Sequence, residues 1–410
     1  MGEAFTAPTQ GSQSFQLVKP EYADASIRRA IAEERLTEDD TALIREYVAE
    51  MRASNGIGIA RANKITFALV NWRRFIGPYR SNTVADLYQA VHVIKSATSQ
   101  RGRPFKQNTI RDHIIFLKRI YLWMIENGYS DIPVKKVEKI RAPPEDHNTK
   151  LPEHLLSLQE IEVMIRACRS SRDRAIIALL YESGCRIGEL ARLTWERVRF
   201  DRYGVVLTVD DTKCSTQRYV RLVLARPYLA AWQADYPFEP VGNALVFLSS
   251  HHRILKHGTA MKLLNTTARR AGLNKHITPH IFRHSRITHL IAEGMNESVI
   301  KLMMWGNINT KMFATYAHLT GREIDQEVLR NYGIVPEEGE MERPLEAIQC
   351  PHCITVNPPG SKYCLRCGLG LGEDAVSAQG LLSKDVLEHP EVMRKLLNEL
   401  IEEKKRNGEL

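Results

Sequence analysis

Residues 134–153, VKKVEKIRAPPEDHNTKLPE, divide the chain into two parts that are expected to fold separately. This stretch is charged, contains three prolines and shows neither the helical nor the strand period of apolar residues. A chain of 410 residues is long enough for about two to four domains. We therefore interpret 134–153 as a linker between one domain at 22–133 and another at 154–333.

The first domain is expected to be a bundle of helices with basic faces. In residues 108–128, apolar side chains recur every three or four positions, as on one face of a helix, with Lys and Arg between them. Residues 1–21 are rich in Ser, Thr, Gln, Gly and Pro without a period and are expected to form a flexible arm. The apolar positions of the helix are Ile110, Ile114, Leu117, Tyr121 and Met124.

The second domain is expected to combine helices with a small sheet. Ser157 and Glu160 match the S-x-x-E pattern of a capping box, which begins a helix. Alternating apolar residues further on predict two antiparallel strands joined by a polar turn. The predicted fold class is mainly α with a small antiparallel sheet, and residues 154–333 form a mixed α+β domain. The alternating residues are Val205, Leu207 and Val209, then Val220 and Leu222.

The composition excludes some classes of protein and leaves others open. The chain has 57 Lys and Arg against 48 Asp and Glu, a net charge of +9, which suits a nucleic acid or an anionic membrane surface as partner. It has no apolar run long enough for a transmembrane helix. The start, MGEAFTAPTQGSQSFQ, lacks the basic and apolar regions of a secretory signal, so we expect a cytoplasmic protein.

Four of the seven cysteines form two C-x-x-C pairs. In a reducing compartment this spacing predicts a metal site rather than disulfides, and four thiolates suit tetrahedral Zn²⁺. We expect a zinc ribbon at 345–372 and a C-terminal helical tail at 373–410. The zinc would be structural, because four protein ligands leave no open position for catalysis. The predicted ligands are Cys350, Cys353, Cys364 and Cys367.

Three stretches of the second domain place anion-binding side chains or a tyrosine near the ends of helices. In LLYESGCRIGELARLTW, one helix ends at Gly184 and Arg186 begins the next, near backbone N–H groups that favour an anion. In ITPHIFRHSRITHLIAEG, His280 and Arg283 share one face of the first helical turn. WGNINTKMFATYAHLT contains Tyr316. Taken singly, a paired corner arginine and a packed tyrosine are the commoner interpretations.

Together, the motifs R-I-G-E-L, T-P-H-x-x-R-H and T-K-M-x-x-x-Y-A-H-L, in this order, resemble the tyrosine recombinase (phage integrase) family, including Xer-like site-specific recombinases. The resemblance implies a core-binding (SAM-like) DNA-binding domain at 22–133 and a catalytic domain at 154–333. It implies an enzyme that cuts and rejoins duplex DNA through a 3′-phosphotyrosine, without ATP or a catalytic metal. It also implies a homo-oligomer, with a tetramer on two recombination sites, which in a prokaryote would associate with the nucleoid.

The resemblance assigns roles to individual residues. Tyr316 would be the nucleophile, and the guanidinium forks of Arg186 and Arg283 would bind the scissile phosphate bidentately. His280 would help to remove the phenolic proton, which is otherwise held with a pKa near 10. Two further residues match supporting positions, Glu189 and His284.

Two positions of the site leave alternatives open. Lys213, in the turn between the predicted strands, matches the family's general acid for the leaving 5′-hydroxyl, with Arg218 and Arg221 as competitors. Asn307 stands nine residues before the tyrosine, where the family usually has a His or Trp that contacts the phosphate. Either Asn307 donates a neutral hydrogen bond there, or Trp305 fills the position.

Two alternatives to recombination stay open. One is DNA relaxation of the type IB topoisomerase kind, which would use similar side chains without a second site. The other is a DNA-binding regulator with little turnover.

Overall fold

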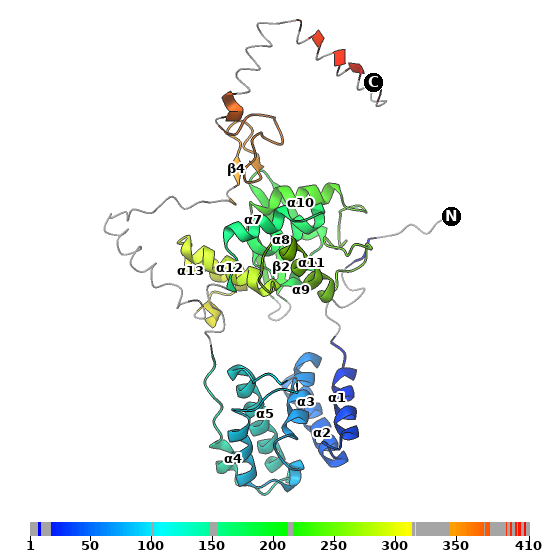
Figure 1. The fold of residues 1–410 in the computed structure, drawn as a ribbon, viewed down its shortest axis with the longest axis vertical. Helices are drawn as coiled ribbons and strands as arrows, with labels where there is room; N and C mark the ends of the chain where they lie inside the picture. The colour runs from blue at the N-terminus through cyan, green and yellow to red at the C-terminus, as the bar shows by residue number, and fades with distance from the viewer. Residues whose placement is uncertain are drawn as a thin grey trace, which may run out of the picture. The chain divides into compact units, whose positions relative to one another are not determined.

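Figure 1 shows the fold in a computed structural model of the chain. It divides into two compact units, which we describe separately: the helical unit, residues 17–149, and the mixed unit, residues 1–16 and 150–410. The structure describes residues 7–9, 18–100, 102–146, 154–211, 216–313, 316, 345, 347–372 and 374–377, and near the C-terminus 391, 394–395, 398–399, 401–402 and 406.

The helical unit packs amphipathic helices around one apolar core (Figure 1). Trp72 is fully buried, and its indole N–H donates to the carbonyl of His113 at 2.8 Å. Buried Asp40 accepts a bond from the backbone N–H of Tyr79 and pairs with Arg73, which ties the start of one helix to the end of another. The elements are α1 (Glu21–Ala32), α2 (Glu38–Asn55), α3 (Ile59–Trp72), η1 (Tyr79–Ser81), α4 (Val84–Val93), α5 (Gln107–Glu126) and α6 (Val134–Glu138).

The first part of the predicted linker belongs to the helical unit. Residues 134–138 form α6, and Val137 and Ile140 are buried in the helical core. The side-chain amide of Asn108 donates to the carbonyl of Asp146 and its oxygen accepts the N–H of the same residue. Val137 and Ile140 lie three residues apart, so a short apolar period is present among the charges. Residues 147–153 lie outside the described residues.

The mixed unit contains helices around a three-stranded antiparallel sheet of order β1-β2-β3 (Figure 1). The capping box of Ser157 and Glu160 begins α7 as predicted. The fold class is mainly α with a small antiparallel sheet, as predicted. The sheet has one strand more than predicted, because β1 is four residues long and shows no apolar alternation. The elements are α7 (Leu158–Arg166), α8 (Ser171–Ser183), α9 (Ile187–Leu190), η3 (Trp195–Arg197), β1 (Val198–Asp201), β2 (Gly204–Asp211), β3 (Thr216–Leu222), α10 (Ala225–Ala234), α11 (His257–Arg270), α12 (Pro279–Ala292) and α13 (Glu297–Trp305).

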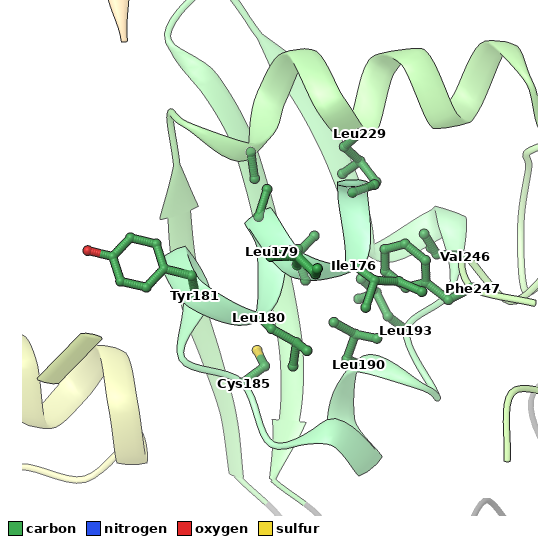
Figure 2. Close-up of a cluster of buried hydrophobic side chains, with 14 of the residues drawn as sticks. Ile176, Leu179, Leu180, Tyr181, Cys185, Leu190, Leu193, Leu229, Val246 and Phe247 are labelled. Atoms are coloured by element: carbon green, nitrogen blue, oxygen red, sulfur yellow. The ribbon is translucent and has the colours of Figure 1, made fainter. Parts of the chain in front are cut away.

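Helix α8 is the centre of the mixed unit. It contacts α7, α10, α12 and β3, and Ala175 through Ser183 are all buried. Figure 2 shows Ile176, Leu179 and Leu180 among side chains of the neighbouring segments, while Tyr181 extends away from the cluster. Because α8 is fixed on all sides, the corner that follows its last residue is also fixed.

Part of the predicted flexible arm is attached to the mixed unit. Thr9 forms an antiparallel bridge with Ala244, and the N–H of Leu245 donates to the carbonyl of Pro8 at 3.0 Å. Ala7 packs against the core of the unit. The reason is an open strand-like edge at 244–245, which offers backbone groups that the arm satisfies.

Beyond residue 344, the structure describes one compact segment and scattered helical residues. Two short strands, β4 (Ile348–Gln349) and β5 (Val356–Asn357), form an antiparallel pair. The described residues between 391 and 406 are helical, where the C-terminal helical tail was expected. In the part of the chain that the structure describes, no helix is long and apolar enough to cross a membrane.

Candidate active site

The corner between α8 and α9 holds Arg186 at its outer edge. Gly184 ends α8 in the left-handed conformation, with φ of 56°, and a Cβ atom there would lie 2.6 Å from Sδ of Met304. The chain needs glycine at this point for both reasons. Arg186 is the N-cap residue of α9, and its side chain is 28% exposed. The sequence predicted both the helix end at Gly184 and the start of the next helix at Arg186.

Glu189 lies between two arginines in this corner. Its Oε2 accepts the backbone N–H of Arg186 at 2.8 Å, and its Oε1 accepts Nη1 of Arg186 at 2.7 Å. On the other side, Nη2 of Arg218 lies 2.6 Å from Oε2. Burial alone would raise the pKa of the Glu189 carboxyl, but the hydrogen bonds and charge of Arg218, with those of Arg186, hold that pKa below its ordinary value. Glu189 is therefore an anion that orients both arginines.

Arg283, near the start of α12, also contacts the corner between α8 and α9. Its side chain is buried, and Nη1 and Nη2 donate to the carbonyls of Gly184 and Met304, each at 2.6 Å. These carbonyls belong to the ends of α8 and α13, where backbone oxygens lack helical partners. Burial, reinforced by the positive charges of Arg218 and Arg186, lowers the pKa of Arg283 to about 10, which leaves it charged at neutral pH.

Tyr316 packs against α12 and the end of α13. Its side chain is 5% exposed, and its hydroxyl lies 2.5 Å from Nδ1 of His284. The ring of Trp305 lies 6.3 Å from the tyrosine ring, and the guanidinium of Arg283 lies 5.2 Å from the centre of the indole. Burial raises the pKa of the Tyr316 hydroxyl to about 12, although the charge of Arg283 opposes this. The phenol therefore needs a proton acceptor to become a nucleophile at neutral pH.

The structure does not bring every predicted residue to the tyrosine. His280 is exposed on the first turn of α12, with its ring 6.5 Å from that of His284, so that His284 and not His280 contacts the hydroxyl. Asn307 is exposed in the turn after α13, where its side-chain oxygen accepts the N–H of Asn309 at 2.8 Å. Lys213 lies outside the described residues, in the segment 212–215 between β2 and β3.

Sequence reasoning treated Arg218 as a competitor of Lys213, and the structure gives it another place. Arg218 is buried in the ion pair with Glu189, whereas Arg221 pairs at the surface with Asp201. The sequence contains a signal for this, because Arg218 is an even number of positions from the apolar strand residues Val220 and Leu222, and such positions share one face of a strand. An arginine on the inward face of a strand indicates a buried ion pair.

The assembled groups can perform phosphoryl transfer on a phosphodiester. Two guanidinium groups, which prefer bidentate contacts with phosphate, lie at the corner after α8, and one of them, that of Arg283, is beside a buried phenol whose hydroxyl contacts an imidazole. Cations fixed in a shielded site stabilise the charge that develops on the non-bridging oxygens of a pentavalent transition state. The class of protein that this fold and site define is a DNA strand-transferase that uses a tyrosine nucleophile.

Comparisons with known proteins agree with this class. Residues 154–323 match the phage integrase family. Residues 154–323 therefore belong to this family of tyrosine recombinases, and the chain is a site-specific recombinase, an enzyme that cuts and rejoins DNA strands. The comparisons favour neither topoisomerase-like relaxation nor a regulator without turnover.

Relatives resemble the chain in sequence and in fold. The tyrosine recombinase XerC of Xanthomonas campestris pv. campestris (strain B100) is 29% identical over 259 residues, which are 62% of this chain and 75% of that protein. XerD of Listeria innocua is 27% identical over 253 residues, 59% of this chain and 82% of that protein. The crystal structure of XerH bound to a palindromic difH substrate matches with a TM-score of 0.54 at 15% identity, over 79% of this chain and 99% of that one. The crystal structure of a lambda integrase dimer bound to a COC′ core site matches with a TM-score of 0.54 at 17% identity, over 74% of this chain and 80% of that one.

A basic hollow of about 990 Å³ lies between α11, the start of α8 and the loop before α11. The cations Arg253, Lys256, Lys262 and Arg270 line it, and none of them forms an ion pair with any residue that the structure describes. A hollow with several uncompensated cations suits a polyanion.

The four predicted cysteine ligands come together in one cluster. Their Sγ atoms lie within 4.8 Å of one another, with 3.6 Å between Cys350 and Cys367 and 3.5 Å between Cys353 and Cys364. A zinc tetrahedron with Zn–S of about 2.3 Å has edges of about 3.8 Å, so the donor set fits the ion. Despite some burial, backbone N–H groups of Cys367 and Arg366 lower the pKa of Cys364 to about 6. Although the backbone N–H of Leu369 opposes it, burial with the neighbouring thiols raises the pKa of Cys367 to about 12, so without a cation the thiolates of the cluster disfavour one another.

Proposed function

We propose that Tyr316 cuts one DNA strand at a time by attacking the scissile phosphate, forming a 3′-phosphotyrosine and releasing a 5′-hydroxyl. The observation that carries this proposal is the contact of the Tyr316 hydroxyl with His284, beside buried Arg283. In this reaction the phenolic oxygen forms a bond to phosphorus, and the bond from phosphorus to the 5′-oxygen breaks. The covalent ester conserves the bond energy, so the free 5′-hydroxyl of another strand can reverse the step without ATP.

The two arginines would bind the phosphate in different ways. Arg283 uses two of its five N–H donors on backbone carbonyls and is thereby held rigid, so its remaining donors can meet the phosphate without further ordering. Arg186 is partly exposed at the edge of the corner and would supply a second fork.

Proton transfer would involve three side chains. His284 accepts the phenolic proton as Tyr316 attacks, since Nδ1 is already in contact with the hydroxyl. His280, one helical turn away, would contact the phosphate or relay that proton. Lys213 would donate a proton to the departing 5′-oxygen, which is too poor a leaving group to depart as a free alkoxide.

Trp305 would supply the phosphate contact that the family usually takes from a His or Trp. Its ring packs against both Arg283 and Tyr316, and its indole N–H is a hydrogen-bond donor. Asn307 instead holds the turn after α13 through its bond to Asn309.

Duplex DNA would be bound by both units, and recombination would take place in a homo-oligomer, a tetramer on two sites. Of the similar lambda integrase structures, one is a dimer bound to a COC′ core site and another is a tetramer bound to a Holliday junction. On this chain, the net charge of +9 and the basic hollow beside α11 support contacts with the DNA backbone. In a prokaryote the protein would associate with the nucleoid.

The cysteine cluster would hold a structural Zn²⁺ and make residues 345–372 a zinc ribbon. The ion would supply the cross-link that a segment too small for a core of its own needs in order to fold. The four sulfur ligands close the coordination shell, so the chain would cut DNA through its side chains alone.

A nicked suicide substrate tests the nucleophile. The short fragment that carries the new 5′-hydroxyl should diffuse away and leave protein joined to the DNA through a 3′-phosphate. Tyr316→Phe should abolish the adduct while DNA affinity changes by less than about twofold, because one buried hydroxyl is removed. An adduct in the phenylalanine variant, or one through a 5′-phosphate, would contradict the proposal.

A further inference from the structure

Arg218 and Glu189 form an ion pair that is almost completely shielded from solvent. Their side chains are 1% and 2% exposed. Nη1 and Nη2 of Arg218 lie 3.1 and 2.6 Å from the two carboxylate oxygens, and Nη2 also lies 3.4 Å from Sγ of Cys185. A guanidinium group that contacts both oxygens of a carboxylate fixes the position and the rotation of that carboxylate. Arg218 therefore holds Glu189 in a single orientation.

Glu189 transmits that orientation to Arg186. The same two oxygens accept the backbone N–H of Arg186 and one N–H of its guanidinium, at 2.8 and 2.7 Å. Nη1 of Arg186 shares Oε1 with Nη1 of Arg218, and the backbone N–H of Arg186 shares Oε2 with Nη2 of Arg218. The Arg186 side chain remains partly exposed.

We propose that Arg218 is a positioning residue for strand cleavage, which acts on the phosphate-binding Arg186 through Glu189. This inference rests on the proposed function. Without Arg218, a buried carboxylate would face Arg186 alone, and a bidentate pair between them would compete with the bidentate pair between Arg186 and phosphate. Arg218 thus neutralises Glu189 and limits how far that carboxylate competes with phosphate for Arg186.

Arg218 also connects the corner to the strand pair on either side of residues 212–215, the segment that contains Lys213. It lies in β3 opposite Val209 of β2. The ion pair is therefore a direct link between the corner after α8 and the β2–β3 pair.

A double-mutant cycle with Glu189 tests the role. Single-turnover cleavage and DNA affinity are measured on the full chain with a suicide substrate, for Arg218→Met, Glu189→Gln and the double variant. Arg218→Met should slow cleavage about 10²-fold, as misplacement of a catalytic group does, and change affinity less than about threefold. In the Glu189→Gln background, where no buried carboxylate is left, Arg218→Met should cost less than about fivefold.

Two further variants separate positioning from general damage. Arg218→Lys keeps the positive charge but cannot contact both carboxylate oxygens with a planar guanidinium. It should cleave at least about tenfold faster than Arg218→Met. Arg221→Met is the matched control, because Arg221 is three residues along the same strand and pairs at the surface with Asp201. Its cleavage rate should be that of the native chain.

Three results would overturn the role of Arg218. The first is that the two substitutions slow cleavage independently, so that their effects multiply in the double variant. The second is that Arg218→Met lowers DNA affinity and melting temperature in parallel with the cleavage rate, and the third is that Arg221→Met slows cleavage as much as Arg218→Met. Failure of the native chain to form any adduct is a different outcome, which overturns the proposed function itself together with this inference.

Discussion

The hydroxyl oxygen of Tyr316 lies 2.5 Å from Nδ1 of His284, the residue that follows Arg283 on α12. This contact joins the proposed nucleophile to the helix that carries Arg283. In the tautomer with Nδ1 unprotonated, it gives the phenolic proton an acceptor before DNA is bound. The pair can therefore be tested separately from the rest of the site.

Replacing His284 with alanine should make cleavage steeply dependent on pH. Since burial raises the pKa of Tyr316 to about 12, only about 10⁻⁵ of the phenol is ionised at pH 7 without an acceptor. The single-turnover rate of His284→Ala should therefore rise about tenfold per pH unit between about pH 7 and 10, whereas the native rate should rise less steeply.

His289→Ala is the control for this measurement. His289 lies in the same helix and contacts the hydroxyl of Tyr181 at 2.9 Å through the same ring nitrogen, outside the group of side chains around Tyr316. Its removal should lower stability and leave the pH slope of cleavage unchanged. A native slope in His284→Ala would show that another group takes the proton.

Gly184→Ala should damage both stability and cleavage. The left-handed conformation costs about 1–2 kcal/mol for a residue with a Cβ atom, and the new methyl group would lie 2.6 Å from Sδ of Met304. The carbonyls of Met304 and Gly184 both accept hydrogen bonds from Arg283, so a displacement of either reaches the arginine proposed to bind phosphate. Chemical denaturation and single-turnover cleavage measure the two effects.

Gly272→Ala provides the comparison. Gly272 has φ of 74°, and a Cβ atom added there would meet no atom within 4 Å, so the substitution isolates the backbone cost. Gly272→Ala should therefore lower the free energy of unfolding by a similar amount and leave the cleavage rate equal to that of the native chain. Equal cleavage rates in the two variants would mean that the corner tolerates displacement of Met304.

Trp305→Ala should slow cleavage much more than Asn307→Ala. Trp305 packs on Arg283 and Tyr316, and loss of one preorganised donor in a shielded site costs about 10²–10³-fold. Asn307 only holds an exposed turn, so its alanine variant should stay within about threefold of the native rate. Single-turnover cleavage rates of the two variants, measured on one preassembled DNA complex, decide which residue contacts the phosphate. A slower rate for Asn307→Ala than for Trp305→Ala would assign that contact to Asn307.

Removal of the metal should unfold residues 345–372 and leave the chemical step intact. Cys364→Ser should abolish stoichiometric zinc, measured by elemental analysis, because a structural site needs all four thiolates. Adduct formation should persist in the presence of a chelator that removes free Mg²⁺. Cys168→Ser is the control, since Cys168 is a buried thiol outside the cluster. Freshly purified native protein without zinc would contradict the assignment.

The basic hollow should contribute to the salt dependence of DNA binding. If Lys262 and Arg270 each contact a phosphate, Lys262→Gln with Arg270→Gln should reduce the slope of log K against log salt by about 1.8. Fluorescence anisotropy on a labelled duplex measures this slope. Arg166→Gln is the control, because Arg166 pairs with Glu162 and its side chain is 75% exposed. An unchanged slope in the double variant would remove the hollow from the DNA interface.

The sequence predicted those parts of the site that depend on local structure. The helix end at Gly184 and the start of α12 at Pro279 follow from residue chemistry within one or two turns. His280 and His284 lie on one side of that helix, four residues apart, so periodicity does not decide which of them meets Tyr316. That choice depends on how the segment carrying the tyrosine packs, which is a tertiary property.

The same limit applies to the sheet and the arm. Strand β1 is held by its pairing with β2 rather than by a pattern of its own. The attachment of residues 7–9 depends on an edge at 244–245 that is far away in the sequence. Arg218 could have been found, because its position on the inward side of β3 follows from strand alternation alone.

The bond between Pro8 and Leu245 sets an order of events during synthesis of the chain. The two residues are 245 − 8 = 237 positions apart, and the helical unit at 17–149 lies entirely between them. At about 5–20 residues per second, the ribosome needs roughly 12–47 s to make that interval. The helical unit thus emerges and can fold while the first residues still lack their partner, and the mixed unit is completed only afterwards.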